Sequence, residues 1–234
     1  MNTLKTTARV TGLWYLALGI TGMLSFLLIR QQLYIDGDTR ATLANLTAQP
    51  TLAHLGVGLE LCVVVTQALA ALWFYKLFAE LNRVAAVGVM AFGLMNSAAI
   101  MTSAAFMAVA LSVVRNSGLA PGGDAAATVG LLAALSSAAW SVGGLFFGLW
   151  LIPMGWVAVT SGRFPSALGW ILVAGGGGYV LSALVGNAWA GAPRALVDSL
   201  TLPATVGEFW MIGYLLSKGI RPTAVLSKMP VPVT

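Results

Sequence analysis

Charged residues are scarce in this 234-residue chain: Lys, Arg, Asp and Glu make up 8% of the sequence, against 59% hydrophobic residues. Soluble domains carry about a quarter charged residues, so an ordinary soluble domain is excluded. The net charge of +5 is spread over the segments between apolar runs and does not form one basic patch. We therefore expect no nucleic-acid partner.

Cysteine and histidine occur once each, as Cys62 and His54. One cysteine cannot form an intramolecular disulfide, and one histidine is too few for a multi-histidine zinc centre or a bis-histidine haem within one chain. No lysine lies in the middle of an apolar run, which argues against a retinal Schiff base, and no grouping of serine, histidine and acid suggests a hydrolase. The sequence thus predicts no cofactor, no metal site and no catalytic residue.

Long apolar runs are the dominant feature of the chain. About 17–25 apolar residues are needed for a helix to cross the hydrocarbon core of a bilayer, and six runs reach that length. We predict an all-α integral membrane bundle of six transmembrane helices, forming a single domain over residues 1–221, with residues 222–234 as a mobile cytoplasmic tail. The predicted spans are 10–29, 54–77, 84–114, 125–159, 167–185 and 200–216.

Basic residues are distributed unequally between the two sides of these spans. Cytoplasmic loops are enriched in Lys and Arg, and placing the N-terminus inside gives eight of them to the cytoplasmic segments and four to the outer ones. The eight are Lys5, Arg9, Lys76, Arg83, Arg163, Lys218, Arg221 and Lys228, and the four are Arg30, Arg40, Arg115 and Arg194. Both termini are therefore predicted to be cytoplasmic, and the polar outer stretch 36–45 is expected to form a short surface helix.

Small residues and tryptophans suggest how the spans pack and where they end. Small residues recur at helical spacing on the fourth and fifth spans, which predicts helix-contact faces; they are Ser137, Ser141, Gly144, Gly148, and Ala174, Gly178, Ser182, Gly186. The alternative for the run 175–178 is an unwound transporter segment. Interfacial anchoring is expected of the tryptophans near span ends, which are Trp14, Trp73, Trp150, Trp156, Trp170 and Trp189.

Two glutamates, Glu60 and Glu208, stand inside apolar runs. An ionisable side chain at bilayer depth is costly, so it is a functional-site hypothesis by default. At 1.5 Å per residue, Glu60 lies ~9 Å and Glu208 ~12 Å below the outer ends of their predicted spans. Neither has an obvious lysine or arginine partner within the membrane, because all four lysines lie at the inner edge of the spans or beyond it. Desolvation is therefore expected to favour the neutral, protonated carboxyl.

These depths predict one outward-facing intramembrane pocket for a ligand or a proton. Its candidate residues are Glu208, Glu60, Asn96, Gln67, Ser137 and Ser141. The expected function is binding or translocation of a small or lipophilic solute. The alternative is a non-transporting accessory or lipid-binding subunit in which the glutamates only make interhelical hydrogen bonds. A membrane lipid-modifying enzyme comes third, since the sequence leans against an enzyme.

Membrane lipids and a small lipophilic or neutral ligand are the expected partners, and a homo-oligomer is left open. The two glutamates fall on the second and sixth spans, which do not correspond in a three-plus-three inverted repeat. That arrangement weakens the case for a carrier.

Four segments carry a resemblance to a known family. They are 6–15, 145–155 with the block F-F-G-L-W-L-I-P-M-G, 161–165 (S-G-R-F-P) and 207–210 (G-E-F-W). Together they resemble the bacterial multi-pass membrane proteins of domain-of-unknown-function family 4386, over nearly the whole chain. The resemblance implies the bacterial cytoplasmic (inner) membrane, implies no established activity, and places Glu208 in the terminal G-E element. A polar or histidine-containing stretch of the family's fourth helix is here the plainer 136–140, which argues against shared catalysis at that position.

Overall fold

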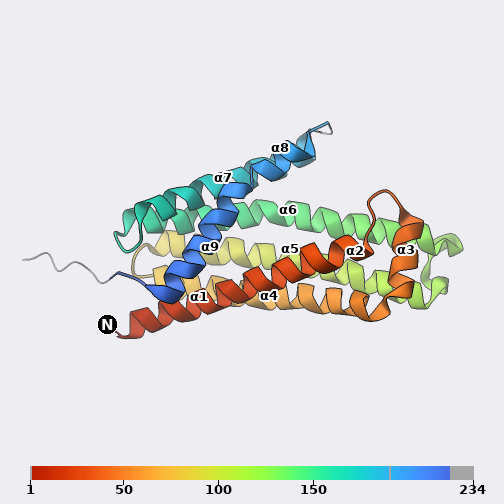
Figure 1. Cartoon of the computed structure of the whole chain (residues 1–234), viewed down its shortest axis with the longest axis horizontal. Coiled ribbons are helices and arrows are strands. Elements are labelled where there is room, and N and C mark those ends of the chain that lie inside the picture. Colours follow the sequence, from red (N-terminus) through yellow and green to blue (C-terminus); the bar gives the residue numbers. More distant parts are fainter. Residues whose placement is uncertain (1, 190, 222–234) are drawn as a thin grey trace, which may run out of the picture.

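The computed structural model describes residues 2–189 and 191–221, which are helical apart from short connections (Figure 1). No strand occurs among these residues, so the predicted all-α class is confirmed. The helices are α1 (Asn2–Met23), η1 (Leu24–Arg30), α2 (Gln31–Leu33), α3 (Thr39–Ala48), α4 (Pro50–Phe78), α5 (Arg83–Arg115), η2 (Ser117–Leu119), η3 (Pro121–Gly123), α6 (Ala125–Thr160), α7 (Ser166–Ala188), α8 (Arg194–Ser199) and α9 (Leu202–Ser217). The expected tail, 222–234, lies outside the described residues.

Five helical segments in the described part of the chain are long and apolar enough to cross a membrane, which indicates a membrane protein. They are Leu4–Leu33, α4, α5, α6 and α7. Predicted bounds for the second to fifth spans agree with the structure to within four residues. The predicted sixth span corresponds to α9, whose 16 residues extend ~24 Å, less than the ~30 Å of hydrocarbon.

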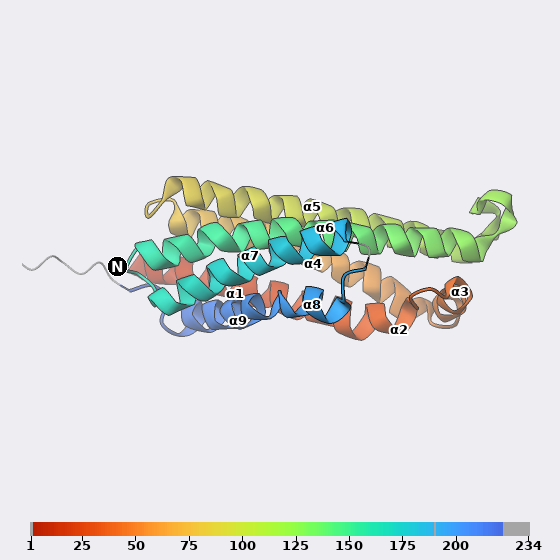
Figure 2. The ribbon, with the colours of Figure 1, turned by 90° about the horizontal axis from the view of Figure 1, so that it is seen from above.

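The long helices pack side by side in the order α1, α4, α5, α6, α7, and α9 lies between α7 and α1 (Figures 1 and 2). A buried group of aromatic residues fills the centre of the bundle. The Tyr15 ring contacts Phe74 and Trp150 edge-on, and its centroid lies 5.3 Å from that of Phe74 and 5.4 Å from that of Trp150. Trp150 is fully buried, so the expectation that it anchors the chain at a membrane interface is wrong. It supports the inner faces of α1, α4 and α6.

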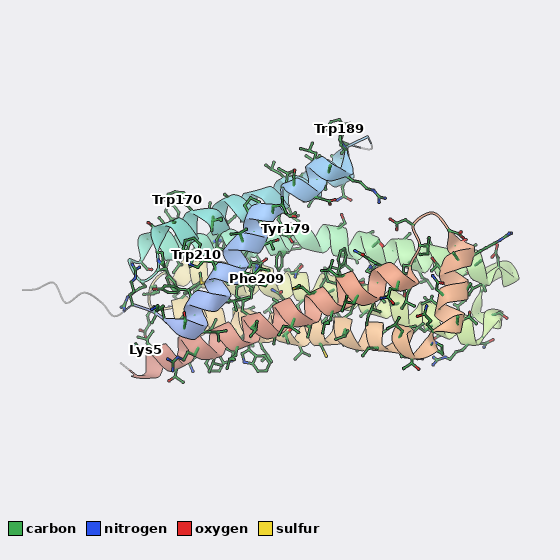
Figure 3. The ribbon with its side chains drawn as sticks, in the orientation of Figure 1. Lys5, Trp170, Tyr179, Trp189, Phe209 and Trp210 are labelled. Carbon is green, nitrogen blue, oxygen red and sulfur yellow. The ribbon has the colours of Figure 1, made fainter. Side chains whose placement is uncertain are left out.

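Two other tryptophans lie on the surface of the bundle. Trp170 and Trp189 are both 55% exposed, at opposite ends of α7 (Figure 3). Nineteen residues separate them, or ~28 Å of α-helix, which matches the thickness of a hydrocarbon core. This spacing is compatible with the interfacial anchoring expected of them.

Glycines bring α6 and α7 into backbone contact. A β-carbon at Gly148 would lie 2.6 Å from the carbonyl oxygen of Gly176, and one at Gly169 would lie 2.6 Å from that of Gly155. Helices in lipid associate where small residues permit this approach. Gly148 was expected at such a contact, but Gly178 instead meets the backbone of Leu200.

The run 175–178 is helical, because α7 continues unbroken through it. The unwound-segment alternative is therefore wrong. On the far side of the bundle, α3 confirms the short helix expected from the polar stretch 36–45. The carboxylate of Asp38 caps it by accepting a hydrogen bond of 2.9 Å from the Ala41 amide.

Candidate functional site

A seven-residue π-helix, η1, continues α1 and ends at Arg30. π-helical segments are rare and frequently occur at functional sites. Because the helical path runs on past Ile29 to Leu33, Arg30 stays in the bundle and is only 8% exposed. Its assignment to an outer loop, made from the end of the apolar run, is wrong.

Arg30 forms a buried ion pair with Glu60 of α4. Its Nη1 lies 2.9 Å from Glu60 Oε1, and the two side chains are 9% and 0% exposed. The same carboxylate oxygen accepts from Trp140 Nε1 at 3.0 Å, and Oε2 accepts from the Ser103 hydroxyl at 2.9 Å. The expectation that Glu60 lacks a cationic partner is wrong, and the opposite charge explains how a carboxylate is accommodated at this depth.

Two serines of α6 also accept hydrogen bonds from the guanidinium. Nη1 donates to Ser136 Oγ and Nη2 to Ser137 Oγ, both at 3.0 Å, and the hydroxyls of Ser136 and Ser103 are 2.7 Å apart. These contacts join four helical segments, η1, α4, α5 and α6. We call the group the arginine cluster; its members are Arg30, Glu60, Ser103, Ser136, Ser137 and Trp140.

Tyr34, just beyond the first span, adds a cation–π contact to this group. The guanidinium carbon of Arg30 lies 5.5 Å from the centroid of the Tyr34 ring. Burial raises the pKa of the Tyr34 phenol to about 12, although the Arg30 charge works in the opposite direction. The phenol is therefore neutral at physiological pH, and its ring face can stabilise the cation.

The arginine cluster reaches the surface of the bundle through Ser137. This serine is exposed, and so is Ser141 one turn further along α6. Ser141 Oγ accepts a hydrogen bond of 3.2 Å from the side-chain amide of exposed Asn187, at the end of α7. A polar strip therefore leads from the surface to the buried guanidinium.

Gln67 and Asn96 lie outside the arginine cluster. Gln67, two turns from Glu60 on α4, is fully buried, and neither its amide nitrogen nor its oxygen has a hydrogen-bond partner among the described residues. The indole nitrogen of Trp150 is likewise unpaired there. Asn96 is 5% exposed, and a β-carbon at Gly143 would lie 3.2 Å from its Oδ1. Of the residues predicted for one pocket, these two contribute no bond to the ion pair.

Glu208 occupies a separate polar contact. Its Oε1 accepts a short hydrogen bond of 2.6 Å from the hydroxyl of Tyr15. Within the described residues, no lysine or arginine forms an ion pair with it. Tyr15 and Arg30 are fifteen residues apart on one continuous helical path, roughly 20 Å. Since each binds one of the two glutamates, Glu60 and Glu208 do not line the same pocket.

The arrangement of the arginine cluster determines what it can do chemically. In residues 2–189 and 191–221, no three His, Cys, Asp or Glu side chains gather as metal ligands would. The cluster instead places a guanidinium, one hydroxyl and an indole N–H on the carboxylate, and two further hydroxyls on the guanidinium. Such a group can bind an acidic or hydrogen-bonding function, or exchange a proton.

Sequence reasoning found Glu60 and Ser137 and placed the neighbouring Ser136 with them, but missed Arg30, Ser103 and Trp140. Arg30 was hidden because it follows the last apolar residue of its run. Ser136 and Trp140 carried a usable signal: they are one turn apart, so with Ser137 they share a face of α6. Ser103 is a single small residue within the long run 84–114, and nothing in its local sequence distinguished it.

Comparison with known proteins agrees with the resemblance noted in the sequence. No curated protein and no solved structure matches the chain. The sequence model of the family described as "Domain of unknown function (DUF4386)" matches residues 10–219. Because that match covers well over half of the chain, including both glutamates, the chain belongs to the DUF4386 family.

Proposed function

We propose that this protein binds a small or lipophilic solute at the arginine cluster, which the solute reaches from the outer side of the bacterial cytoplasmic membrane. The observation that carries the proposal is the bond from buried Arg30 to Ser137, an exposed residue. The guanidinium has more N–H donors than its bonds to Glu60, Ser136 and Ser137 use. An acidic or hydrogen-bonding head group that enters beside Ser137 can accept a hydrogen bond from one of these unused N–H groups.

The proposed orientation is supported by the charges at the two ends of the bundle. At the end where α1 begins, the described residues include seven Lys or Arg and one Glu; they are Lys5, Arg9, Lys76, Arg83, Arg163, Lys218, Arg221 and Glu80. At the opposite end there are three Arg and four Asp; they are Arg40, Arg115, Arg194, Asp36, Asp38, Asp124 and Asp198. This asymmetry favours a cytoplasmic N-terminus.

A sixth span made by α8 and α9 together would put both termini on the cytoplasmic side. α8 follows the outer end of α7, and α9 returns along the bundle to the end where α1 begins (Figure 1). The apolar residues on the outer surface of α9 support contact with lipid: Leu202, Val206 and Phe209 are all more than half exposed. The arginine cluster then faces the outer half of the membrane.

The second candidate function is that of an accessory subunit in which the cluster only holds helices together. It is favoured by the complete pairing of Glu60, both of whose oxygens accept hydrogen bonds within the bundle. A purely structural ion pair has no need of an exposed member. The bond to Ser137 is therefore the feature on which the two functions differ.

Ser137→Val tests the proposal, because it removes the exposed hydroxyl and fills the entry with methyl groups. Thr102→Val is the matched control: Thr102 is exposed on α5, and within the described part of the chain its hydroxyl bonds only to the Ala98 carbonyl of its own helix. Both variants and the wild type are purified in mild detergent, and bound small molecules and lipids are identified by mass spectrometry. We expect a compound retained by the wild type and the control to be lost from Ser137→Val. Identical retention by all three proteins would support the accessory function instead.

A further inference from the structure

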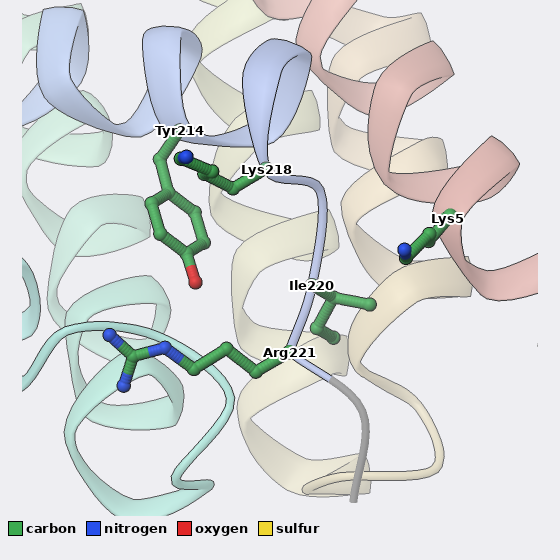
Figure 4. Close-up of a pocket in the computed structure, with 5 residues that line it drawn as sticks. All are labelled: Lys5, Tyr214, Lys218, Ile220 and Arg221. Atoms are coloured by element: carbon green, nitrogen blue, oxygen red, sulfur yellow. The ribbon is translucent and has the colours of Figure 1, made fainter.

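A basic cavity lies at the other end of the bundle from the arginine cluster. It has a volume of about 360 Å³ and is lined by Lys5, Tyr214, Lys218, Ile220 and Arg221 (Figure 4). These residues come from the beginning of α1, the end of α9 and the segment that follows α9. The cavity thus lies where the first and last described segments of the chain meet.

A fixed backbone turn builds one wall of this cavity. After α9 the chain reverses at Gly219, whose φ of +73° is one that glycine adopts without strain. The amides of Lys218 and Gly219 both donate to the Tyr214 carbonyl, at 2.9 and 3.0 Å. Arg221 N then donates to the Arg163 carbonyl at 3.2 Å, and Arg163 Nη1 donates to the Arg221 carbonyl at 2.8 Å. The turn is therefore held against the connection between α6 and α7.

Among the described residues, no carboxylate forms an ion pair with the cations lining the cavity. Lys5, Lys218 and Arg221 are exposed, and none forms an ion pair with a described Asp or Glu. Residues 222–234 contain no Asp or Glu either. Figure 4 shows the Lys218 and Arg221 side chains on the side of the Tyr214 ring, with Lys5 across the returning segment. The cavity is a place of unbalanced positive charge.

An apolar side chain lies among these cations. Ile220 is 3% exposed and lines the cavity between Lys5 and the Tyr214 side. A free phosphate ion would gain nothing from an isoleucine, whereas a phospholipid brings a phosphate together with glycerol and acyl chains. Basic pockets between helices at the cytoplasmic membrane edge are suited to anionic head groups.

We propose that this cavity binds the phosphate head group of an anionic phospholipid. Lys218 and Arg221 would contact the phosphate, because guanidinium and ammonium groups form charge-assisted hydrogen bonds with phosphate oxygens. Lys5 would add to the positive charge around the phosphate, and Ile220 would contact the glycerol end of the lipid. The site is independent of the proposed solute site, since the two lie at opposite ends of the bundle and share no residue.

The test measures retention of phosphatidylglycerol and phosphatidylcholine by the full chain, using native mass spectrometry from mixed detergent–lipid micelles. The variants are Lys5→Gln, Lys218→Gln, Arg221→Gln and their triple combination. The matched control is Lys76→Gln/Arg83→Gln, two exposed cations at the same end that do not line the cavity. We expect selective retention of phosphatidylglycerol, a loss of about fivefold for each single change, no selective retention by the triple variant, and no change in the control.

Three outcomes would overturn the proposal. The first is that the triple variant still retains phosphatidylglycerol selectively. The second is that the Lys76/Arg83 control loses as much phosphatidylglycerol as the cavity variants, which would mean that only overall charge matters. The third is equal thermal stabilisation of the lipid-free protein by inorganic phosphate and by phosphatidylglycerol, which would assign the cavity to a soluble anion. All the substituted side chains are exposed, so each variant is expected to fold, and a thermal melt of each one checks this.

Discussion

Removing either member of the Arg30–Glu60 pair is expected to destabilise the bundle strongly. Breaking a buried ion pair by deleting one partner costs about 3–5 kcal/mol, because a buried charge is left uncompensated. Burial of both side chains, at 9% and 0% exposure, and the 2.9 Å contact place this pair in that class. Arg30→Met also removes the bonds to Ser136 and Ser137, so we expect the upper end of the range for it and the lower end for Glu60→Gln.

The double variant Arg30→Met/Glu60→Gln should lose less stability than the two single changes added together. We expect a coupling free energy of about 2 kcal/mol or more, since residues in one charged network couple by ~0.5–3 kcal/mol. The assay is reversible unfolding in mixed detergent micelles, followed by circular dichroism. The pair Arg194–Asp36 is the control: its N–O distance is 3.4 Å, but its side chains are 87% and 81% exposed, so no measurable coupling is expected. Additive losses at Arg30 and Glu60 would refute the reasoning.

Three further changes test other parts of the bundle by the same unfolding assay. Gly148→Leu should lower the free energy of unfolding by about 1–3 kcal/mol or more, because the new side chain overpacks against the backbone of α7. Gly177→Leu should cause no such loss, because the space around Gly177 is open. Equal losses of stability in the two variants would contradict the contact between α6 and α7. Gln67→Met should be neutral or stabilising by about 1–2 kcal/mol, because it removes a buried amide that has no hydrogen-bond partner among the described residues. A large loss of stability would show that the amide has a partner. Tyr15→Phe removes the hydrogen bond to Glu208 and should cost about 1–3 kcal/mol, and unchanged stability would contradict that role.

Hydropathy predicted most of the fold because lipid imposes a simple length requirement on helices. The second to fifth spans were located to within four residues, since charged or turn-forming residues stand at their ends. The length of the first span was underestimated for the same reason. Its predicted end was set by Arg30, a charged residue, whereas the helical path continues to Leu33. The sequence shows where burying a charged side chain would cost free energy, but it does not show where the folded bundle provides that side chain with a partner.

The candidate site could be predicted only in part, for a related reason. Glu60 was conspicuous because a carboxylate in an apolar run stands out locally. Its partners come from η1, α5 and α6, up to eighty residues away in sequence, and no local pattern brings them together. The prediction that Glu60 and Glu208 share one outer pocket is wrong, because similar depths on two separate helices do not bring two side chains together. Tyr15 and Arg30 bind the two carboxyls at different levels of one helical path.

Small-residue spacing was also informative only in part. A repeat of four residues correctly selected Gly148, but the glycines that meet across α6 and α7 recur every seven residues, as Gly148 with Gly155 and Gly169 with Gly176. Seven residues are two turns, so both spacings keep to one helix face. Which face meets which neighbour depends on how the helices are arranged, and that is a property of the whole bundle.

The π-helix has a geometric consequence for the direction in which Arg30 projects. An α-helix turns 100° per residue, whereas hydrogen bonding from i to i+5 gives roughly 82°. Over the seven residues of η1 the difference accumulates to roughly 120°, a third of a turn. A helical wheel extrapolated from α1 would therefore point Arg30 away from Glu60. The π-helix thus rotates Arg30 about the helix axis toward Glu60. Deleting one residue from Leu24–Arg30 should therefore displace the guanidinium more than any single substitution within that segment.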